Sequence, residues 1–134
     1  MSLNNNTKVF LALKGIQSII RGESFRFDCQ VLKNDSVSSP SPGLDLTNLE
    51  LLEIFFPANN PQGKVVIDNS EAGPIVVSGA EFGSFSFLLS SEESESLHVG
   101  AIDYEARFTF DDGSVFIAQV KNGLNVIDRL VKAE

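Results

Sequence analysis

Few side chains in this sequence could carry out nucleophilic or acid–base chemistry. It contains one His, His98, and one Cys, Cys29. Any Cys-His or Ser-His-Asp arrangement would therefore have to use His98 as its imidazole. No motif around His98 supplies a nucleophile together with an orienting carboxylate. We therefore expect His98 to be a solvated turn residue, and we expect the protein not to be an enzyme and to have no catalytic residues.

The single thiol follows a pattern of structural burial. Cys29 is in phase with Phe25, Phe27 and Val31, while polar residues occupy the intervening positions. This phase predicts a buried thiol with a raised pKa that behaves as a small apolar side chain. A lone cysteine cannot form an internal disulfide, which suits folding in a cytoplasm.

Two acidic runs, residues 92–95 and the pair 111–112, contain carboxylates of the kind that bind calcium. An EF-hand loop needs oxygen ligands at alternate positions over twelve residues and a terminal Glu, and neither run has them. The glycine-containing segment 79–83 lacks the helix and Lys that follow a phosphate-binding loop. We expect no metal site and no cofactor.

Length and charge restrict the class of protein further. The chain has 134 residues and a net charge of −8, with ten Lys and Arg against eighteen Asp and Glu. That size fits one domain, and the acidic balance argues against nucleic acid or an anionic membrane as the main partner. No apolar run approaches the roughly 18 residues of a membrane-spanning helix, and the start of the chain lacks the pattern of a secretory signal.

The acidic residues are unevenly distributed along the chain. Between Lys64 and Arg107 there is no Lys or Arg. Eight acids fall in that interval: Asp68, Glu71, Glu81, Glu92, Glu93, Glu95, Asp103 and Glu105. Two explanations stay open, a surface that keeps the protein soluble and a contact surface for a basic neighbour.

Alternation of apolar and polar residues indicates the fold class. Phe residues recur at a spacing of two with polar residues between them, the pattern of antiparallel strands with one buried face. Short strands separated by turn signals favour an all-β sandwich. The predicted strands are Lys8–Leu13, Ile16–Ile20, Ser24–Leu32, Leu49–Phe56, Lys64–Asp68, Pro74–Ser78, Ser84–Leu89, Ile102–Phe110, Val115–Lys121 and Leu124–Asp128.

Three local signals complete this prediction. Asp111-Asp112-Gly113 predicts a hairpin turn, because Gly accepts a positive φ at little cost. Ser90 with Glu93 three residues later fits a capping box, which predicts one short helical turn ending near residues 97–98. The polar stretches 33–43 and 57–63 are too short for domain linkers. We therefore expect one β-sandwich domain over residues 16–134, preceded by an arm or edge strand over residues 1–15.

The predicted strand Leu49–Phe56 does not alternate cleanly. Glu50 is in phase with Leu52 and Phe56, whereas Glu53 is in phase with Phe55. A β-bulge could switch the faces of this strand, or both faces could be covered, which would imply a partner subunit on the outside. We favour the bulge, because bulges are common at sheet edges.

Five motifs occur in an order that resembles the order found in a known family. They are Ile20-Arg21-Gly22-Glu23-Ser24-Phe25, Asp45-Leu46-Thr47-Asn48, Gly83-Ser84-Phe85-Ser86-Phe87 with the acidic turn behind it, Gly100-Ala101-Ile102-Asp103-Tyr104-Glu105, and Asp112-Gly113-Ser114-Val115 leading to Asn122-Gly123. Together they resemble the immunoglobulin-like β-sandwich domains of tailed bacteriophages and prophages, such as the N-terminal domain of baseplate upper proteins and related tail-fibre attachment domains. The departures are Asn48 where the family prefers Gly, the insertion at 33–43 and the stretch before Gln17.

The resemblance implies an immunoglobulin-like antiparallel β-sandwich in a non-enzymatic virion structural protein. Tail, baseplate or fibre attachment is the first placement and capsid decoration the second. It implies that the partners are other virion proteins and copies of itself in a homo-oligomer, and that the protein is made in the host cytoplasm and resides in the virion. Tyr104, on an inward phase, should be a core aromatic whose hydroxyl finds a backbone partner.

The segment Lys8–Leu13 is apolar and lies before the part of the chain that resembles the family. Its backbone could pair with the domain's own sheet or be donated to a neighbour's sheet. We favour the neighbour, which makes Val9, Phe10, Leu11 and Leu13 the candidate assembly interface.

A binding module for host-surface carbohydrate is the rival hypothesis. Sugars usually stack on exposed Trp or Tyr, and this sequence has no Trp and one Tyr. An exposed Phe55-Phe56 cluster could substitute for them.

Overall fold

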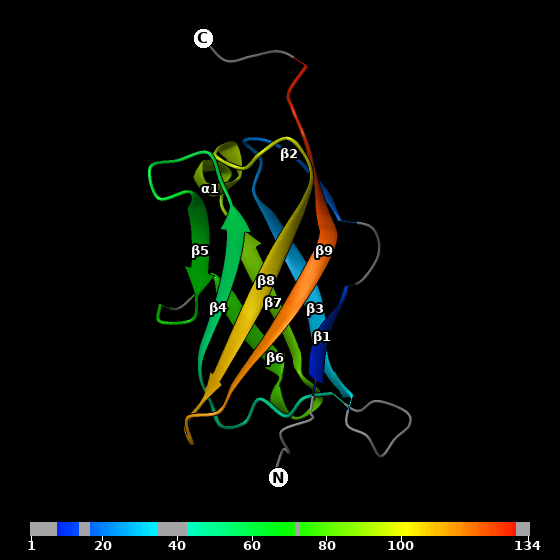
Figure 1. The fold of residues 1–134 in the computed structure, drawn as a ribbon, viewed down its shortest axis with the longest axis vertical. Helices are drawn as coiled ribbons and strands as arrows, with labels where there is room; N and C mark the ends of the chain where they lie inside the picture. Colours follow the sequence, from blue (N-terminus) through cyan, green and yellow to red (C-terminus); the bar gives the residue numbers. More distant parts are fainter. Residues whose placement is uncertain (1–7, 14–16, 35–42, 72, 131–134) are drawn as a thin grey trace.

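The computed structural model describes residues 8–13, 17–34, 43–71 and 73–130. These residues form two β-sheets packed face to face, with two short helical turns (Figure 1). The four-stranded sheet has the order β1-β3-β7-β6, and all its neighbours are antiparallel. Its strands are β1 (Lys8–Leu13), β3 (Phe25–Asn34), β7 (Ser84–Leu89) and β6 (Ile75–Gly79).

The second sheet has five strands in the order β2-β9-β8-β4-β5. They are β2 (Ser18–Ile20), β9 (Val115–Ile127), β8 (Gly100–Phe110), β4 (Leu49–Pro57) and β5 (Lys64–Asp68). The two strand orders are those of a seven-stranded immunoglobulin domain with two added strands, β2 beside β9 and β5 beside β4. The prediction of an all-β immunoglobulin-like sandwich is confirmed.

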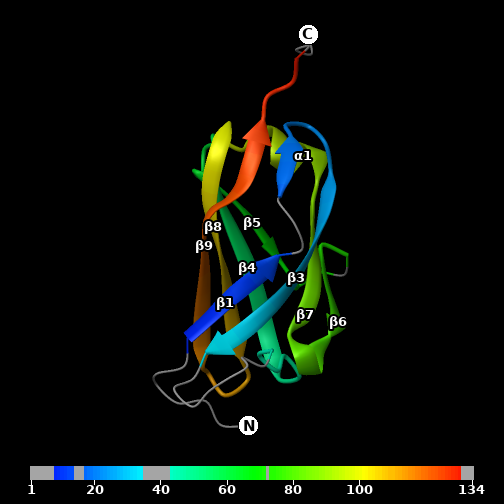
Figure 2. The ribbon, with the colours of Figure 1, turned by 90° about the vertical axis from the view of Figure 1, so that its right-hand side faces the viewer.

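One strand pair departs from the expected antiparallel arrangement. β2 pairs in parallel with β9, from Ser18↔Asn125 to Ile20↔Ile127. β1 and β2 point towards the same end of the sandwich although they belong to different sheets (Figure 2). A period of two appears in parallel and antiparallel strands alike, and β2 is only three residues long, so its pattern could not reveal this direction.

The core lies between the sheets and is built from the predicted inward phases. The largest fully buried aromatic side chains are Phe27, Phe56, Phe85, Phe87 and Phe108. Phe27 and Phe87 stack across β3 and β7 with ring centroids 4.8 Å apart. Each such side chain contributes about 1.5–3 kcal/mol by leaving water, so the Phe alternation is the main determinant of the sandwich.

β4 contains the predicted bulge. Its register with β8 shifts between Leu49 and Leu51, which leaves Glu50 as the extra residue. Leu52 and Phe56 are buried in the core, while Leu51 and Phe55 lie half-buried on the opposite face. The two explanations of this strand are therefore compatible, because a bulge is present and apolar side chains also occur on the outer face.

The helical turns and the last strand correct two details of the prediction. α1 (Ser91–Glu95) has the predicted capping box, in which the Glu93 amide donates to Ser90 Oγ at 3.1 Å and the Ser90 amide donates to Glu93 Oε1 at 2.8 Å. A second turn, η1 (Ala80–Phe82), was not predicted and ends at Gly83 with φ 74°. β9 is continuous where two strands were expected, because Asn122 adopts φ 50° in a bulge without ending the strand.

Candidate functional site: the outer face of the five-stranded sheet

The proposed N-terminal interface requires a correction. β1 pairs with β3 of its own domain over its whole length, from Lys8↔Asn34 to Leu13↔Cys29, as an edge strand of the four-stranded sheet. The structure therefore has this strand in the alternative arrangement, paired with its own sheet, and not donated to a neighbour as we had favoured. β3 of the same chain has a free edge beside which β1 can pair over its whole length. Pairing within one chain avoids the entropy cost of bringing two molecules together.

The four candidate interface residues have different environments. Val9 and Leu11 pack against the core. Phe10 lies on the opposite face of β1 and is 41% exposed. The Leu13 side chain lies outside the described part of the structure. Of the three described side chains, only Phe10 is available to a partner.

The side chains considered for chemistry are not assembled into a catalytic arrangement. His98 is exposed between α1 and β8, as expected of a turn residue. Cys29 is buried, and that burial, with a smaller effect of the Asp28 charge, raises the pKa of the thiol to about 12. Among the described residues, no group of three or more His, Cys, Asp or Glu side chains could hold a metal ion, and no helix is long and apolar enough to cross a membrane.

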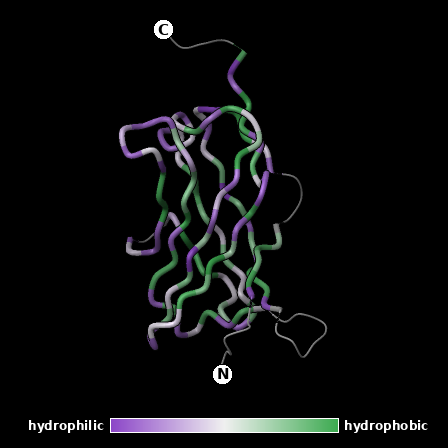
Figure 3. The backbone as a smooth tube through the Cα atoms, viewed as in Figure 1, coloured by the Kyte–Doolittle hydropathy of each residue, from purple (hydrophilic) through white to green (hydrophobic). Residues whose placement is uncertain are grey.

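Apolar side chains lie exposed or half-buried on the outer face of the five-stranded sheet, on both sides of a polar central strand. β8 presents Glu105, Arg107 and Thr109 on this face, and alternation along β8 and β9 is visible in Figure 3. The flanking strands present Leu51, Phe55, Val66, Val115 and Ile117, which we call the outer-face patch. Glu53 lies between Leu51 and Phe55 on the same face of β4, opposite Arg107.

Two residues of the outer-face patch, Phe55 and Val66, are direct neighbours by register. Leu51 and Val115 lie on either side of Thr109, and Val115 and Ile117 are successive residues on this face of β9. Val115 and Ile117 are 51% and 46% exposed. Scattered exposed apolar residues are ordinary, but apolar residues adjacent across strands of one face are typical of a contact surface.

Cationic side chains cover part of Phe55. Arg107 Cζ lies 4.9 Å from the centre of the Phe55 ring, and Lys64 Nζ lies 5.8 Å from it. Each contact stabilises the half-exposed ring by about 0.5–1 kcal/mol. Arg107 also lies 3.7 Å from the Glu105 carboxylate. These contacts explain why Phe55 is only half-exposed.

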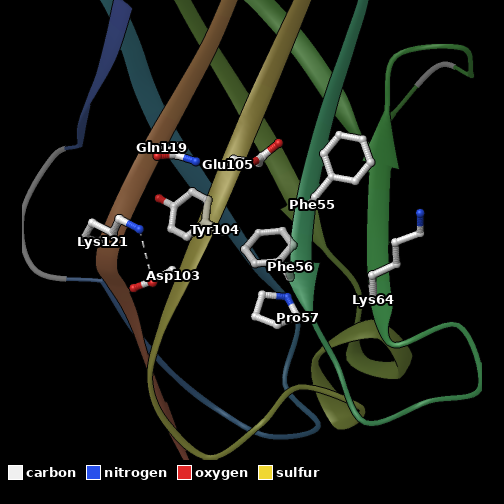
Figure 4. A pocket seen from close by; sticks show the side chains of 9 residues that line it. All are labelled: Phe55, Phe56, Pro57, Lys64, Asp103, Tyr104, Glu105, Gln119 and Lys121. Carbon is white, nitrogen blue, oxygen red and sulfur yellow. Dashed lines mark ion pairs between the residues drawn. The ribbon is translucent and has the colours of Figure 1, made fainter.

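The Phe55-Phe56 platform proposed for carbohydrate does not form. Phe56 is 1% exposed, and the two rings lie on opposite sides of β4 in Figure 4. Successive side chains of a strand point to opposite faces, so two adjacent Phe residues cannot form one exposed surface. Tyr104 is also buried.

A shallow hollow of about 330 Å³ lies beside Phe55 at one end of this face (Figure 4). Its rim carries two cations, Lys64 and Lys121, and two carboxylates, Asp103 and Glu105. Lys121 lies 3.8 Å from Asp103, which also accepts a hydrogen bond from the Asn122 amide at 2.7 Å. The hollow is mixed in charge and contains no nucleophile paired with a base.

The Tyr104 hydroxyl does not have, in the described part of the chain, the backbone hydrogen-bond partner that we expected for it. Its ring stacks on Phe56 at 5.0 Å, and burial raises the pKa of the phenol. Among the described residues, however, the hydroxyl oxygen has no hydrogen-bond partner. The bulge of β9 lies beside this ring, since a Cβ on Gly123 would come within 2.7 Å of Tyr104 Cε1. The sequence signal for that bulge was the Asn-Gly pair, which is typical of positive-φ turns.

An ion-pair network at one end of the sandwich was not foreseen. The Glu95 carboxylate of α1 forms ion pairs with two guanidinium groups, that of Arg21 at 3.4 Å and that of Arg129 at 2.7 Å. Arg21 also lies 3.7 Å from Asp128. These residues are far apart in the sequence, and their types alone gave no signal of this pairing.

Comparisons with known proteins give no family. No protein-family model matches the chain, and no curated protein matches it. Among solved structures, the chain is similar to a superoxide reductase (neelaredoxin) from Ignicoccus hospitalis, with 12% sequence identity and a TM-score of 0.48, covering 91% of this chain and 82% of that one. At that distance the likeness supports no conclusion about what this chain does.

Proposed function

We propose that this protein is a non-enzymatic structural subunit that works by assembling, and that the outer-face patch is its contact with a second copy. The observation that carries the proposal is the adjacency of Phe55 and Val66 on one side of β8 and of Val115 and Ile117 on the other. A two-fold pairing would bury the same patch on both copies.

The charges on β8 are compatible with such a pairing. Arg107 and Glu105 lie between the two apolar margins and have opposite signs. An antiparallel approach of two copies can place each guanidinium against the partner's carboxylate. Because each copy carries a net charge of −8, this apolar association should strengthen when salt screens the repulsion.

We further propose that the assembly is a tailed-phage particle, with this subunit in the tail, baseplate or fibre-attachment region. The five ordered motifs and the immunoglobulin-like sandwich support this placement. The subunit would act geometrically, since a rigid sandwich repeated by symmetry multiplies weak contacts.

Sedimentation velocity at increasing protein concentration tests the self-contact. Ile117→Asp should weaken self-association at least tenfold, whereas Val99→Asp is a matched control, because Val99 is comparably exposed but lies outside the outer-face patch. A wild-type protein that stays monomeric at its highest soluble concentration, or equal weakening by both variants, would contradict the self-contact.

The virion placement needs a separate test. Particles purified from the organism that encodes the protein should contain it at a fixed copy number by mass spectrometry, with matching density in the imaged tail. Intact particles that lack the protein would overturn the placement and leave the self-contact unaffected.

A further inference from the structure

The four sheet edges of the described structure differ in their protection. β1 carries Lys8 and lies against β9, and β2 has only three residues. β5 has a charged residue at each end, Lys64 and Asp68. β6 has no charged residue and no Pro over Ile75–Gly79. Proteins usually protect exposed edges with charges, Pro or very short strands, so β6 is the unprotected edge of this sandwich.

The backbone of β6 is directed to accept another strand. The Pro74 carbonyl accepts a hydrogen bond from the Leu88 amide at 2.7 Å. Pro74 and Leu88 are therefore a hydrogen-bonded pair, and such pairs alternate with non-hydrogen-bonded pairs along an antiparallel ladder. The next non-hydrogen-bonded residues of β6 are Ile75 and Val77, so their amides and carbonyls point away from β7 to the open edge. The register shift near Ser78 ends this regular stretch. Two residues therefore offer four main-chain groups to a partner strand.

The side chains along this edge are apolar. Val76 is 46% exposed and Val77 is 39% exposed, and they lie on opposite sides of the strand. A strand added beside β6 would cover both. The edge therefore suits a partner segment with apolar side chains in its middle.

Most of the charged side chains around the ends of β6 are carboxylates. A polar hollow of about 280 Å³ next to Pro74 carries the carboxylates of Asp68, Glu71 and Glu93, with no basic residue in its lining. Glu81 is exposed beyond the other end of the strand. One cation lies close to the start of β6: the Arg26 guanidinium donates to Ser86 Oγ at 3.1 Å and to the Gly73 carbonyl at 3.0 Å.

We propose that β6 accepts an extended segment of another protein, apolar in its middle and with Lys or Arg at its ends. The main chain of that segment would bond Ile75 and Val77, and one basic side chain would enter the hollow beside Glu71. A second copy of this chain is a poor occupant, because its own β6 has Glu71 before it and Glu81 after it, and like charges would meet. This proposal extends the assembly role by giving the subunit a hetero-contact separate from the outer-face patch.

An array of seven-residue peptides, with alternating Val and Thr inside and Lys, Ala or Glu at both ends, provides the probe. We expect binding by the Lys-ended peptides, weaker binding by the Ala-ended ones and none by the Glu-ended ones. The binding should weaken with added salt, opposite to the outer-face self-contact. In the nuclear magnetic resonance spectrum, the bound peptide should shift the amides of Ile75 and Val77 most.

Two pairs of variants test the site. Val77→Pro removes an outward amide without removing a bond to β7 and should weaken binding at least fivefold, while Val77→Ala keeps the amide and much of the binding. Glu71→Lys should weaken binding at least threefold, while Glu92→Lys makes the same change of net charge on exposed α1 and should have little effect. Thermal melts identify any variant that fails to fold.

Three results would overturn the proposal: no binding by any peptide, binding without preference for basic ends, or unchanged binding by Val77→Pro. None of these three results would bear on the self-contact through the outer-face patch. The Val77→Pro and Glu71→Lys variants should therefore self-associate like the wild type in sedimentation. Loss of self-association in Ile117→Asp with intact peptide binding would separate the two surfaces.

Discussion

The Arg129 guanidinium lies 2.7 Å from the Glu95 carboxylate and so joins the segment after β9 to α1. Arg21 reaches the same carboxylate and also donates from Nε to the Glu95 carbonyl at 3.2 Å. The Gly22 amide donates to Ser94 Oγ, which in turn donates to the Glu23 carbonyl. The turn after β2, the helix and the end of β9 are therefore one connected unit.

Glu95→Gln should destabilise the fold by about 1 kcal/mol, which lowers the melting temperature by roughly 3–6 °C. The loss is modest because both charged partners remain partly exposed to solvent. Glu92→Gln is the control, since no hydrogen bond or ion pair joins its side chain to the described residues. Thermal unfolding at low and high salt checks the prediction, and equal melting temperatures for the two variants would contradict it.

Tyr104→Phe should leave the protein as stable as the wild type or stabilise it by up to about 1–2 kcal/mol, because it removes a buried hydroxyl that has no partner among the described residues. The stacking on Phe56 is retained. Urea unfolding measures the change in free energy. A loss of more than about 1 kcal/mol would mean that the hydroxyl does have a partner.

Gly123→Ala should destabilise the domain by about 1–3 kcal/mol through overpacking. A Cβ at this position would overlap Val120 Cγ1 and would come within 2.7 Å of the Tyr104 ring. Gly79→Ala is the matched control, since its nearest atom would be 3.4 Å away and its φ is also negative. Chemical unfolding of both variants compares them, and equal losses would show that the bulge can widen.

Deleting residues 1–14 should lower the melting temperature of the monomer by several degrees or more, because the deletion removes β1 and uncovers β3. Val9 and Leu11 would no longer cover the core beside β9. Each kcal/mol lost shifts a domain of this size by roughly 3–6 °C. A truncated protein that melts at the wild-type temperature would restore the donated-strand hypothesis.

Thiol reagents should modify Cys29 only after unfolding. The thiol is buried, and its pKa is raised from 9.0 to about 12, so almost no thiolate exists at neutral pH. The folded state favours the neutral thiol, because the pKa is about 12 in the folded protein and 9.0 in the unfolded chain. The stability that comes from this difference is fully present below pH 9 and is lost as the pH rises towards 12. Mass spectrometry after labelling with and without denaturant measures this, and rapid labelling of the native protein would contradict the register of β3.

Much of this fold could be predicted from local pattern. The spacing of Phe25, Phe27 and Cys29 predicted a strand with one buried face, and Ser90 with Glu93 predicted the start of α1. These signals work because side-chain direction in a strand and capping at a helix start depend on residues only two or three positions apart.

The candidate surfaces depended on tertiary structure. The pairing of β1 with β3 and the parallel pairing of β2 with β9 depend on which strands lie at the sheet edges in the assembled sandwich. Whether Phe55 faced the core or solvent depended on the bulge at Glu50, and the exposed edge of β6 is a consequence of strand order. Arg129 meets Glu95 only because the end of β9 is brought to α1. A sequence read locally gives the direction of each side chain within its strand, whereas contacts between distant segments follow from the packing that satisfies all strands together.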